Sequence, residues 1–213
     1  MQKEAKAAKN NYQKKHREAI RYAKKNNLPI RKVGANGKIT ELQGLDATGR
    51  PRYYTTFENP GKKVAGTEAA ATTSTNLVWE GGGLNLNLNG STATVAGKIG
   101  VWDGSGVLTT HRELTGRVTQ QDRPTDDDQD HATHVAGIMI GTGVNSRAKG
   151  MAYKASLKAY DWNNDISEVT SAAAAGLLVS NHSYGLGNIG WVYNADRTGD
   201  IKWEWYEIGR AHV

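Results

Sequence analysis

The segment KIGVWDGSG, residues 98–106, most constrains the fold, because an apolar run ends at an acid and then breaks into glycines. An apolar run of this length predicts a strand. In open α/β sheets, the crevice beyond the carboxyl ends of the strands is where ligands and chemistry are found. Asp103 is therefore predicted to lie where an acid can act. The alternative is an aspartate that caps a turn beside Gly104.

A second segment, QDHATHVAG at residues 129–137, places two histidines three residues apart. The apolar residues that follow predict a mostly buried helix that begins near His131. At a helix N-terminus the positive end of the dipole disfavours imidazolium, so the ring of His131 is expected to be neutral and able to accept a proton. His131 is thus either a catalytic base or, together with His134, part of a metal pair.

The metal interpretation would add acids from TDDDQD, residues 125–130. Histidines at i and i+3 without an intervening glutamate do not match the usual zinc helix, which needs i and i+4. The acids also lack the glycine and the terminal glutamate of a calcium loop. A solvated acidic loop is therefore predicted. No cofactor is expected, and a structural calcium ion has no support in the sequence.

Length and composition set the limits for both motifs. A chain of 213 residues can form one good-sized domain or a domain with an appendage. Because it contains no cysteine, disulfide scaffolds and zinc–thiolate sites are excluded. No apolar run approaches eighteen residues, and the first thirty residues lack an apolar signal core, so neither a membrane span nor an export signal is predicted in this sequence.

The net charge of +6 is concentrated at the N-terminus. Residues 1–32 hold eleven Lys or Arg and two Glu. Their smaller apolar set recurs near the helical period, which predicts an amphipathic helix with a cationic, solvated face: Ala8, Tyr12, Ala19, Ile20 and Ala23. No aromatic platform or recognition motif accompanies this charge, so neither nucleic acid nor a membrane is expected as a partner.

Beyond this helix, the segment PIRKVGANGKITELQG predicts two strands joined by a turn at Asn36-Gly37. RPRYYTT predicts a third strand, which completes a small α+β appendage over residues 1–58. Residues 59–76, rich in Gly, Ala and Thr and without periodicity, are expected to form a linker. The alternating LNLNLN that follows is a strand-like pattern.

Four segments in order, VWDGSG, HATHVAG, AKGMAYKASLKAYDW and LLVSNHSYG, resemble the first half of a subtilisin-like serine protease, a subtilase. The resemblance covers most of residues 72–190. It implies an α/β fold with a doubly wound, mostly parallel sheet and helices on both faces, here incomplete and preceded by the α+β appendage. It also implies a serine endopeptidase that acts on protein or peptide substrates, outside the cell or in its envelope.

The resemblance gives Asp103 the role of the acid that orients the base, and His131 the role of the general base. His134 is similar to a second, structural histidine of the family and is expected to point into packing. Ala132 stands where the family usually has glycine, and Tyr153 stands where a proline is common.

Ser183, Tyr184 and Gly185 match the backbone edge to which a subtilase adds an extended substrate. The resemblance places the strand at residues 155–162 beside this edge. Residues 1–58 occupy the position of a pro-region, which in subtilases helps the domain to fold and blocks its cleft as an intramolecular inhibitor. The alternative is an accessory or binding module that is never removed.

The resemblance also exposes a gap, because the sequence holds no Gly-Thr-Ser-x-Ala segment and no asparagine recognisable as an oxyanion-hole donor. Ser171 in VTSAAAAG lacks the glycine and fits a crossover helix better than a nucleophile. The last seven residues, EIGRAHV at 207–213, look like a translated sequencing adapter. Residues 77–206 are therefore expected to be the N-terminal part of a catalytic domain, inactive as written. A metal-dependent hydrolase and a non-catalytic inhibitory module are the alternatives.

Overall fold

The computed structural model describes residues 1–34, 37–56, 66–124, 128–186, 190–193 and 203–206. These residues divide into two compact units. The first contains residues 1–11 and 58–183, and the second contains residues 12–57 and 184–213.

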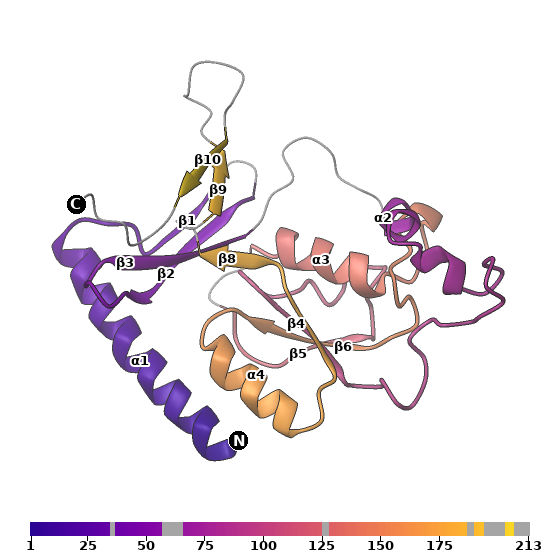
Figure 1. Cartoon of the computed structure of the whole chain (residues 1–213), viewed down its shortest axis with the longest axis horizontal. Helices are drawn as coiled ribbons and strands as arrows, with labels where there is room; N and C mark the ends of the chain where they lie inside the picture. The colour runs from indigo at the N-terminus through magenta and orange to yellow at the C-terminus, as the bar shows by residue number, and fades with distance from the viewer. Residues whose placement is uncertain (35–36, 57–65, 125–127, 187–189, 194–202, 207–213) are drawn as a thin grey trace. The chain divides into compact units, whose positions relative to one another are not determined.

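A parallel four-stranded sheet forms the centre of the first unit (Figure 1). Its order is β5 (Val118–Gln120), β6 (Leu157–Asp161), β4 (Ile99–Asp103) and β7 (Val179–His182). The predicted α/β fold with a parallel sheet is confirmed. Because parallel strands end at the same edge of a sheet, Asp103 and Asp161 are register partners at the carboxyl ends of β4 and β6.

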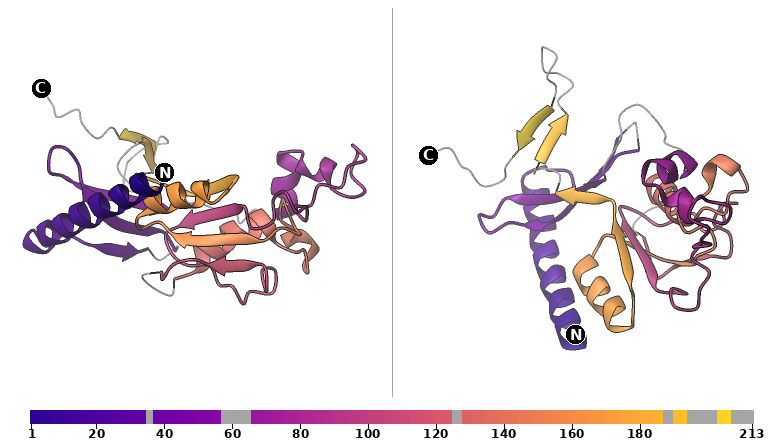
Figure 2. Two further views of the ribbon diagram at one scale, coloured as in Figure 1. Left: turned by 90° about the horizontal axis from the view of Figure 1, so that it is seen from below. Right: turned by 45° about the vertical axis from the view of Figure 1, so that its right-hand side comes forward.

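Helices cover both faces of this sheet (Figure 2). Helix α3 (Asp130–Ile140) packs on the face that carries Val101 and Ala159, which belong to the main apolar core. Helix α4 (Asp165–Ala174) lies on the other face, where Glu168 contacts Trp102. Neighbouring residues of a strand point to opposite faces, so Val101 of β4 packs on the side of α3 and Trp102 on the side of α4.

The face toward α4 is built from a ladder of rings on three adjacent strands. The indole of Trp102 stacks on Tyr160 with ring centroids 4.2 Å apart and on His182 at 5.2 Å. Trp102 is fully buried, and its indole N–H donates to a carboxylate oxygen of Glu168 at 3.1 Å. The buried N–H therefore has the partner that burial of an indole requires.

The N-terminal helix α1 spans Gln2–Lys25, as the periodicity predicts. It ends before Asn27, whose φ of 53° is left-handed and cannot continue a helix. The second unit then forms an antiparallel sheet in the order β1 (Arg31–Val33), β2 (Ile39–Leu45), β3 (Pro51–Thr56) and β8 (Tyr184–Leu186). The three strands expected in the appendage are thus present. Asn36 of the expected turn lies outside the described residues, and Gly37 has a φ of 80°.

A small core of Ala19, Ala23 and Leu42 joins α1 to β2 within the second unit. A separate antiparallel pair, β9 (Gly190–Tyr193) and β10 (Trp203–Tyr206), completes the described strands. Among the described residues, none of the helices has both the length and the apolar character that crossing a membrane requires.

Part of the range expected to be a linker is helical. Residues 66–72 form α2 (Gly66–Thr72), and η1 (Thr75–Val78) follows. The alanines that made this segment look featureless are strong helix formers, and Ala70 packs against Trp79 and Tyr153. A third short turn, η2 (Ser146–Ala148), lies after α3.

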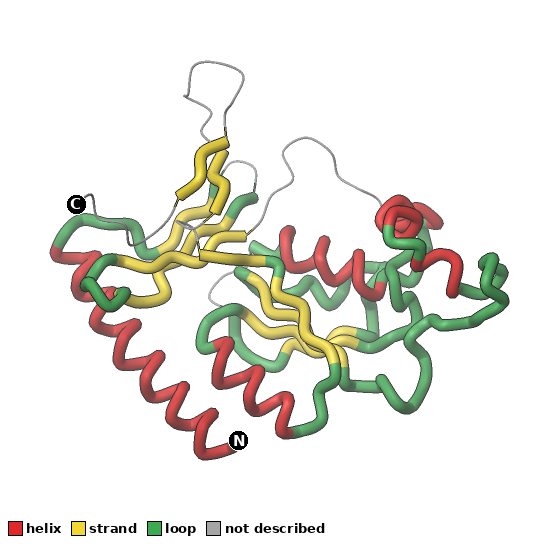
Figure 3. The backbone as a smooth tube through the Cα atoms, in the orientation of Figure 1, coloured by secondary structure: helices red, strands yellow, loops and turns green. Residues whose placement is uncertain are grey.

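The LNLNLN segment is not a strand, although it alternates; the stretch between η1 and β4 is mostly loop (Figure 3). Its amides donate to the preceding turn, Leu84 N to Leu77 O and Leu88 N to Val78 O, so they are not used in a sheet ladder. Leu84 and Leu88 are exposed.

Candidate active site

Asp103 is the last residue of β4 and is completely buried. The chain turns away immediately after it, and the amide of Gly104 donates to Oδ1 of its carboxylate at 2.7 Å. Asp103 therefore lies at the carboxyl end of β4, and the hydrogen bond from the backbone N–H of Gly104 fixes the orientation of its carboxylate.

His131 lies in the first turn of α3, and its Nδ1 is 2.7 Å from Oδ1 of Asp103. This separation lies within the range of about 2.6–3.2 Å expected for an acid that orients a base. An ionised carboxylate can only accept a hydrogen bond, so the geometry favours the tautomer with hydrogen on Nδ1. Proton transfer to or from a substrate would then use Nε2.

The two side chains differ in burial. The Asp103 side chain is 1% exposed, whereas that of His131 is 16% exposed. The second carboxylate oxygen of Asp103, Oδ2, is buried and has no hydrogen-bond partner among the described residues. Burying a carboxylate with so few hydrogen-bond donors costs free energy. The hydrogen bond to His131 therefore stabilises the carboxylate strongly, especially when the ring is protonated.

Two hydrogen bonds tie the loop after β4 to its surroundings. The amide of Leu108 donates to Thr133 Oγ1 in the first turn of α3 at 2.9 Å. The backbone N–H of Val107 donates to Gln120 Oε1, and the side-chain Nε2 of Gln120 donates to Asp122 Oδ1. No periodic pattern in the sequence predicts these contacts.

Glu113 organises the loop that follows α3, and sequence reasoning missed it. Its buried carboxylate accepts the backbone N–H groups of Gly143, Val144 and Asn145 at 2.7, 3.0 and 2.8 Å. Burial acts to raise the pKa of this carboxyl, but the three N–H groups and the charge of Arg112 outweigh burial and lower the pKa below its ordinary value. The carboxylate is therefore the ionised form at neutral pH.

The two histidines of the motif differ in exposure, His131 being partly buried and His134 exposed. His134 is exposed, so the expectation that it points into packing is wrong. The cause is the helical phase: the buried stripe of α3 runs through Ala132, Ala136 and Ile140, and His134 lies off it. Among the residues that the structure describes, no three His, Cys, Asp or Glu side chains are grouped to hold a metal ion. Asp126 and Asp127 lie outside those residues.

Both departures from the family pattern are accommodated by packing. The methyl group of Ala132 is fully buried in the main core. The ring of Tyr153 lies edge-on to Trp79, and the ammonium of Lys149 sits 3.8 Å from its centroid. A proline at this position would provide no ring for that cation–π contact.

The expected substrate edge forms a strand, but with a different neighbour from the one predicted. Tyr184 and Gly185 lie in β8, which pairs antiparallel with β3 through Thr56 and Thr55, respectively. The strand at 155–162 does not lie beside this edge, because β6 is held between β5 and β4. Just before β8, the hydroxyl of Ser183 accepts a hydrogen bond from Asn181 at 2.9 Å.

Ser171 is held within α4, where its hydroxyl donates to the carbonyl of Ser167 at 2.8 Å. Helix α4 covers the sheet face opposite to α3, which carries His131. The structure therefore does not bring Ser171 to the proposed base, in agreement with its assignment to a crossover helix.

Comparison with known proteins identifies the segment that holds these residues. The family model described as the subtilase family matches residues 97–205, just over half of the chain. No curated protein and no solved structure matches the chain. The matched segment contains the whole parallel sheet and the contact between Asp103 and His131. The chain therefore belongs to the subtilase family.

Proposed function

We propose that Asp103 and His131 are the acid and the base of an Asp-His-Ser triad in a serine endopeptidase. The family is one of serine peptidases. The observation that carries the proposal is the 2.7 Å contact between a buried carboxylate at a strand end and a partly exposed imidazole at a helix start.

In this mechanism Nε2 of His131 takes the proton of the serine hydroxyl as the hydroxyl attacks the peptide carbonyl. The same nitrogen later returns the proton to the leaving amine. Asp103 keeps the imidazole in the tautomer with hydrogen on Nδ1 and stabilises the imidazolium that forms between these steps. The buried position of Asp103 strengthens that interaction, because water does not screen it.

We propose that the nucleophile is not among these 213 residues, which contain no Gly-Thr-Ser-x-Ala segment. The 213 residues alone are then expected to hydrolyse no peptide. We also propose that residues 77–206 belong to the catalytic domain and that the enzyme works outside the cell or in its envelope, as subtilases commonly do.

The N-terminal segment, residues 1–58, is proposed to act as an intramolecular inhibitor and folding aid, with residues 59–76 as its connection to the catalytic domain. Support comes from β3, which is hydrogen-bonded to β8 as an added antiparallel strand. The rings of Tyr54 and Tyr184 reinforce the pairing, with centroids 5.0 Å apart. In this proposal β3 occupies the place of the substrate. When β3 is absent, extended peptide substrate would pair with Ser183, Tyr184 and Gly185.

A chimera tests the proposed function. The part of a known subtilase that carries its serine motif is joined after Tyr206, and hydrolysis of a peptide substrate is measured. The chimera is expected to turn over substrate and to be inactivated by a serine-directed phosphonate, whereas the 213-residue chain is not expected to turn over substrate. Activity of the chain alone that disappears in His131→Ala would show that a nucleophile within it was overlooked.

A further inference from the structure

The ladder of rings on the sheet face toward α4 ends at Tyr160. Trp102 stacks on one face of this ring, with centroids 4.2 Å apart and an angle of 5° between the ring planes. On the other side of β6, Gln121 follows directly after β5, and its backbone N–H donates to Ala159 O at 2.8 Å. Its exposed side chain donates to Thr119 O at 3.1 Å. Because neither β5 nor Gln121 carries a ring, the second face of Tyr160 has no stacking partner among the described residues.

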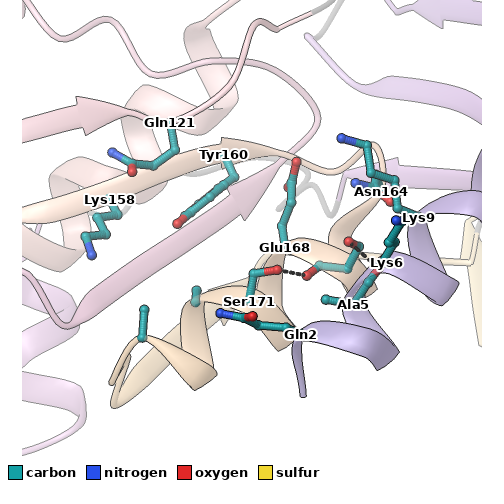
Figure 4. Close-up of a pocket in the computed structure, with 13 residues that line it drawn as sticks. Gln2, Ala5, Lys6, Lys9, Gln121, Lys158, Tyr160, Asn164, Glu168 and Ser171 are labelled. Carbon is teal, nitrogen blue, oxygen red and sulfur yellow. Dashed lines mark hydrogen bonds between the residues drawn. The ribbon is translucent and has the colours of Figure 1, made fainter.

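Tyr160 and Gln121 both line a hollow of about 540 Å³, walled by β6, α4 and the first turns of α1 (Figure 4). All of its lining residues belong to the first compact unit. Strand β6 contributes Lys158 beside Tyr160, and α1 contributes Lys6 and Lys9 from the facing wall. A hollow of this volume is in the range of sites that hold small molecules.

Positive charge lines this hollow. Lys158 lies two residues before Tyr160 in β6, so both side chains are on the same face of the sheet, about 7 Å apart along the strand. Lys6 and Lys9 supply two more ammonium groups. Within the described ranges of the chain, none of these three lysines has a carboxylate as an ion-pair partner. The ammonium groups are therefore available to an anion that enters the hollow.

The carboxyl group that lines the hollow carries little negative charge. It belongs to Glu168 of α4, and burial and the carboxylate of Asp122 raise its pKa to about 8, so it is mostly protonated at neutral pH. Asp122 itself does not line the hollow. Its two oxygens accept hydrogen bonds from Gln120 Nε2 and from the backbone N–H of Asp161, both at 2.8 Å. An anion is therefore expected to lie on the Lys158 side of the Tyr160 ring, away from these acids.

We propose that this hollow binds a small planar aromatic anion, whose ring stacks on the second face of Tyr160 and whose carboxylate or phosphate pairs with Lys158. The ligand ring would continue the ladder that Trp102 and Tyr160 form, since offset stacking of aromatic rings is favourable. A hydrogen bond from an ammonium group to an anion is stronger than one between neutral groups. The site contains neither Asp103 nor His131 and is therefore independent of the proposed function.

Three probes separate the ring from the charge. Naphthoate is expected to bind the 213-residue chain at least about tenfold more tightly than its neutral analogue naphthamide or the non-aromatic anion cyclohexanecarboxylate, as measured by NMR titration. The ring protons of Tyr160 should move upfield as the naphthalene ring stacks on them. Adenosine monophosphate, compared with naphthoate, distinguishes a phosphate ligand from a carboxylate ligand. Binding of neither aromatic anion, equal affinity for naphthoate and naphthamide, or Tyr160 resonances that do not move would overturn the proposal.

Two pairs of variants locate the site. Lys158→Ala is expected to weaken naphthoate binding about tenfold, whereas Lys3→Ala, which removes the same charge at an exposed position outside the hollow, should stay within about twofold of wild type. Tyr160→Phe keeps the stacking face and should bind as wild type, whereas Tyr160→Leu should weaken binding about fivefold. If Tyr160→Leu does not fold, as judged by circular dichroism, the lysine pair decides. Equal losses in Lys158→Ala and Lys3→Ala would contradict the site.

Discussion

In the chimera, His131→Ala is expected to lower kcat by about 10⁶-fold and Asp103→Asn by about 10⁴-fold, the sizes known for loss of the base in subtilisin and of the orienting acid in chymotrypsin-like proteases. Without His131, nothing takes the proton of the serine. With asparagine at 103, the amide can donate to Nδ1 and hold the imidazole in the wrong tautomer. Steady-state kinetics on a peptide substrate measures both losses.

His134→Ala is the matched control, since His134 lies one turn further along the same helix and is exposed. Its kcat is expected to stay within about twofold of the parent, as for other exposed positions outside a site. If His134→Ala lost as much activity as His131→Ala, or if Asp103→Asn kept full activity, the assignment of the dyad would be wrong.

Glu113→Gln is expected to lower the free energy of unfolding by about 3 kcal/mol, the scale for breaking a buried, charge-assisted cluster. Glutamine has the same shape but offers one acceptor oxygen and an NH₂ group, which cannot accept from the amides. At least one of the backbone N–H groups of Gly143, Val144 and Asn145 then loses its partner. Urea unfolding at neutral pH, monitored by circular dichroism, measures the loss.

The same variant has a pH signature. The pKa of Glu113 is lower in the folded chain than its ordinary value, so its stabilisation is fully present above that value and is lost as the pH falls through the folded pKa. The difference between wild type and Glu113→Gln should therefore shrink in acid. Glu80→Gln, at an exposed glutamate, is expected to change stability by less than about 0.5 kcal/mol. A pH-independent difference would contradict the role of the ionised carboxylate.

The central contact of the site could be predicted from the sequence because each partner lies within a local pattern. Asp103 ends an apolar strand before a glycine, and His131 begins an apolar helix. These patterns fix the elements, and the order of the motifs relates them to a known fold. Glu113 had no such signal, since its partners are backbone amides thirty residues away whose approach depends on the tertiary fold.

The predictions that the structure corrects also depend on features that a local sequence pattern does not specify. The orientation of His134 depends on helical phase: Ala132 and Ala136 of α3 are buried, whereas His134 between them is exposed. The neighbour of the strand at Tyr184–Leu186 depends on pairing between distant segments, which alternation along one strand does not specify. Helix α2 was missed because an alanine-rich stretch of seven residues shows little periodicity.

Nitrogen NMR of His131 tests the central claim most directly, because it needs neither substrate nor nucleophile. The account predicts a ring with hydrogen on Nδ1 and a far-downfield proton resonance from the bond to Asp103, which disappears in Asp103→Asn. A His131 ring with hydrogen on Nε2 and none on Nδ1, or a spectrum that Asp103→Asn leaves unchanged, would contradict the claim that these two residues form the acid and base of the site.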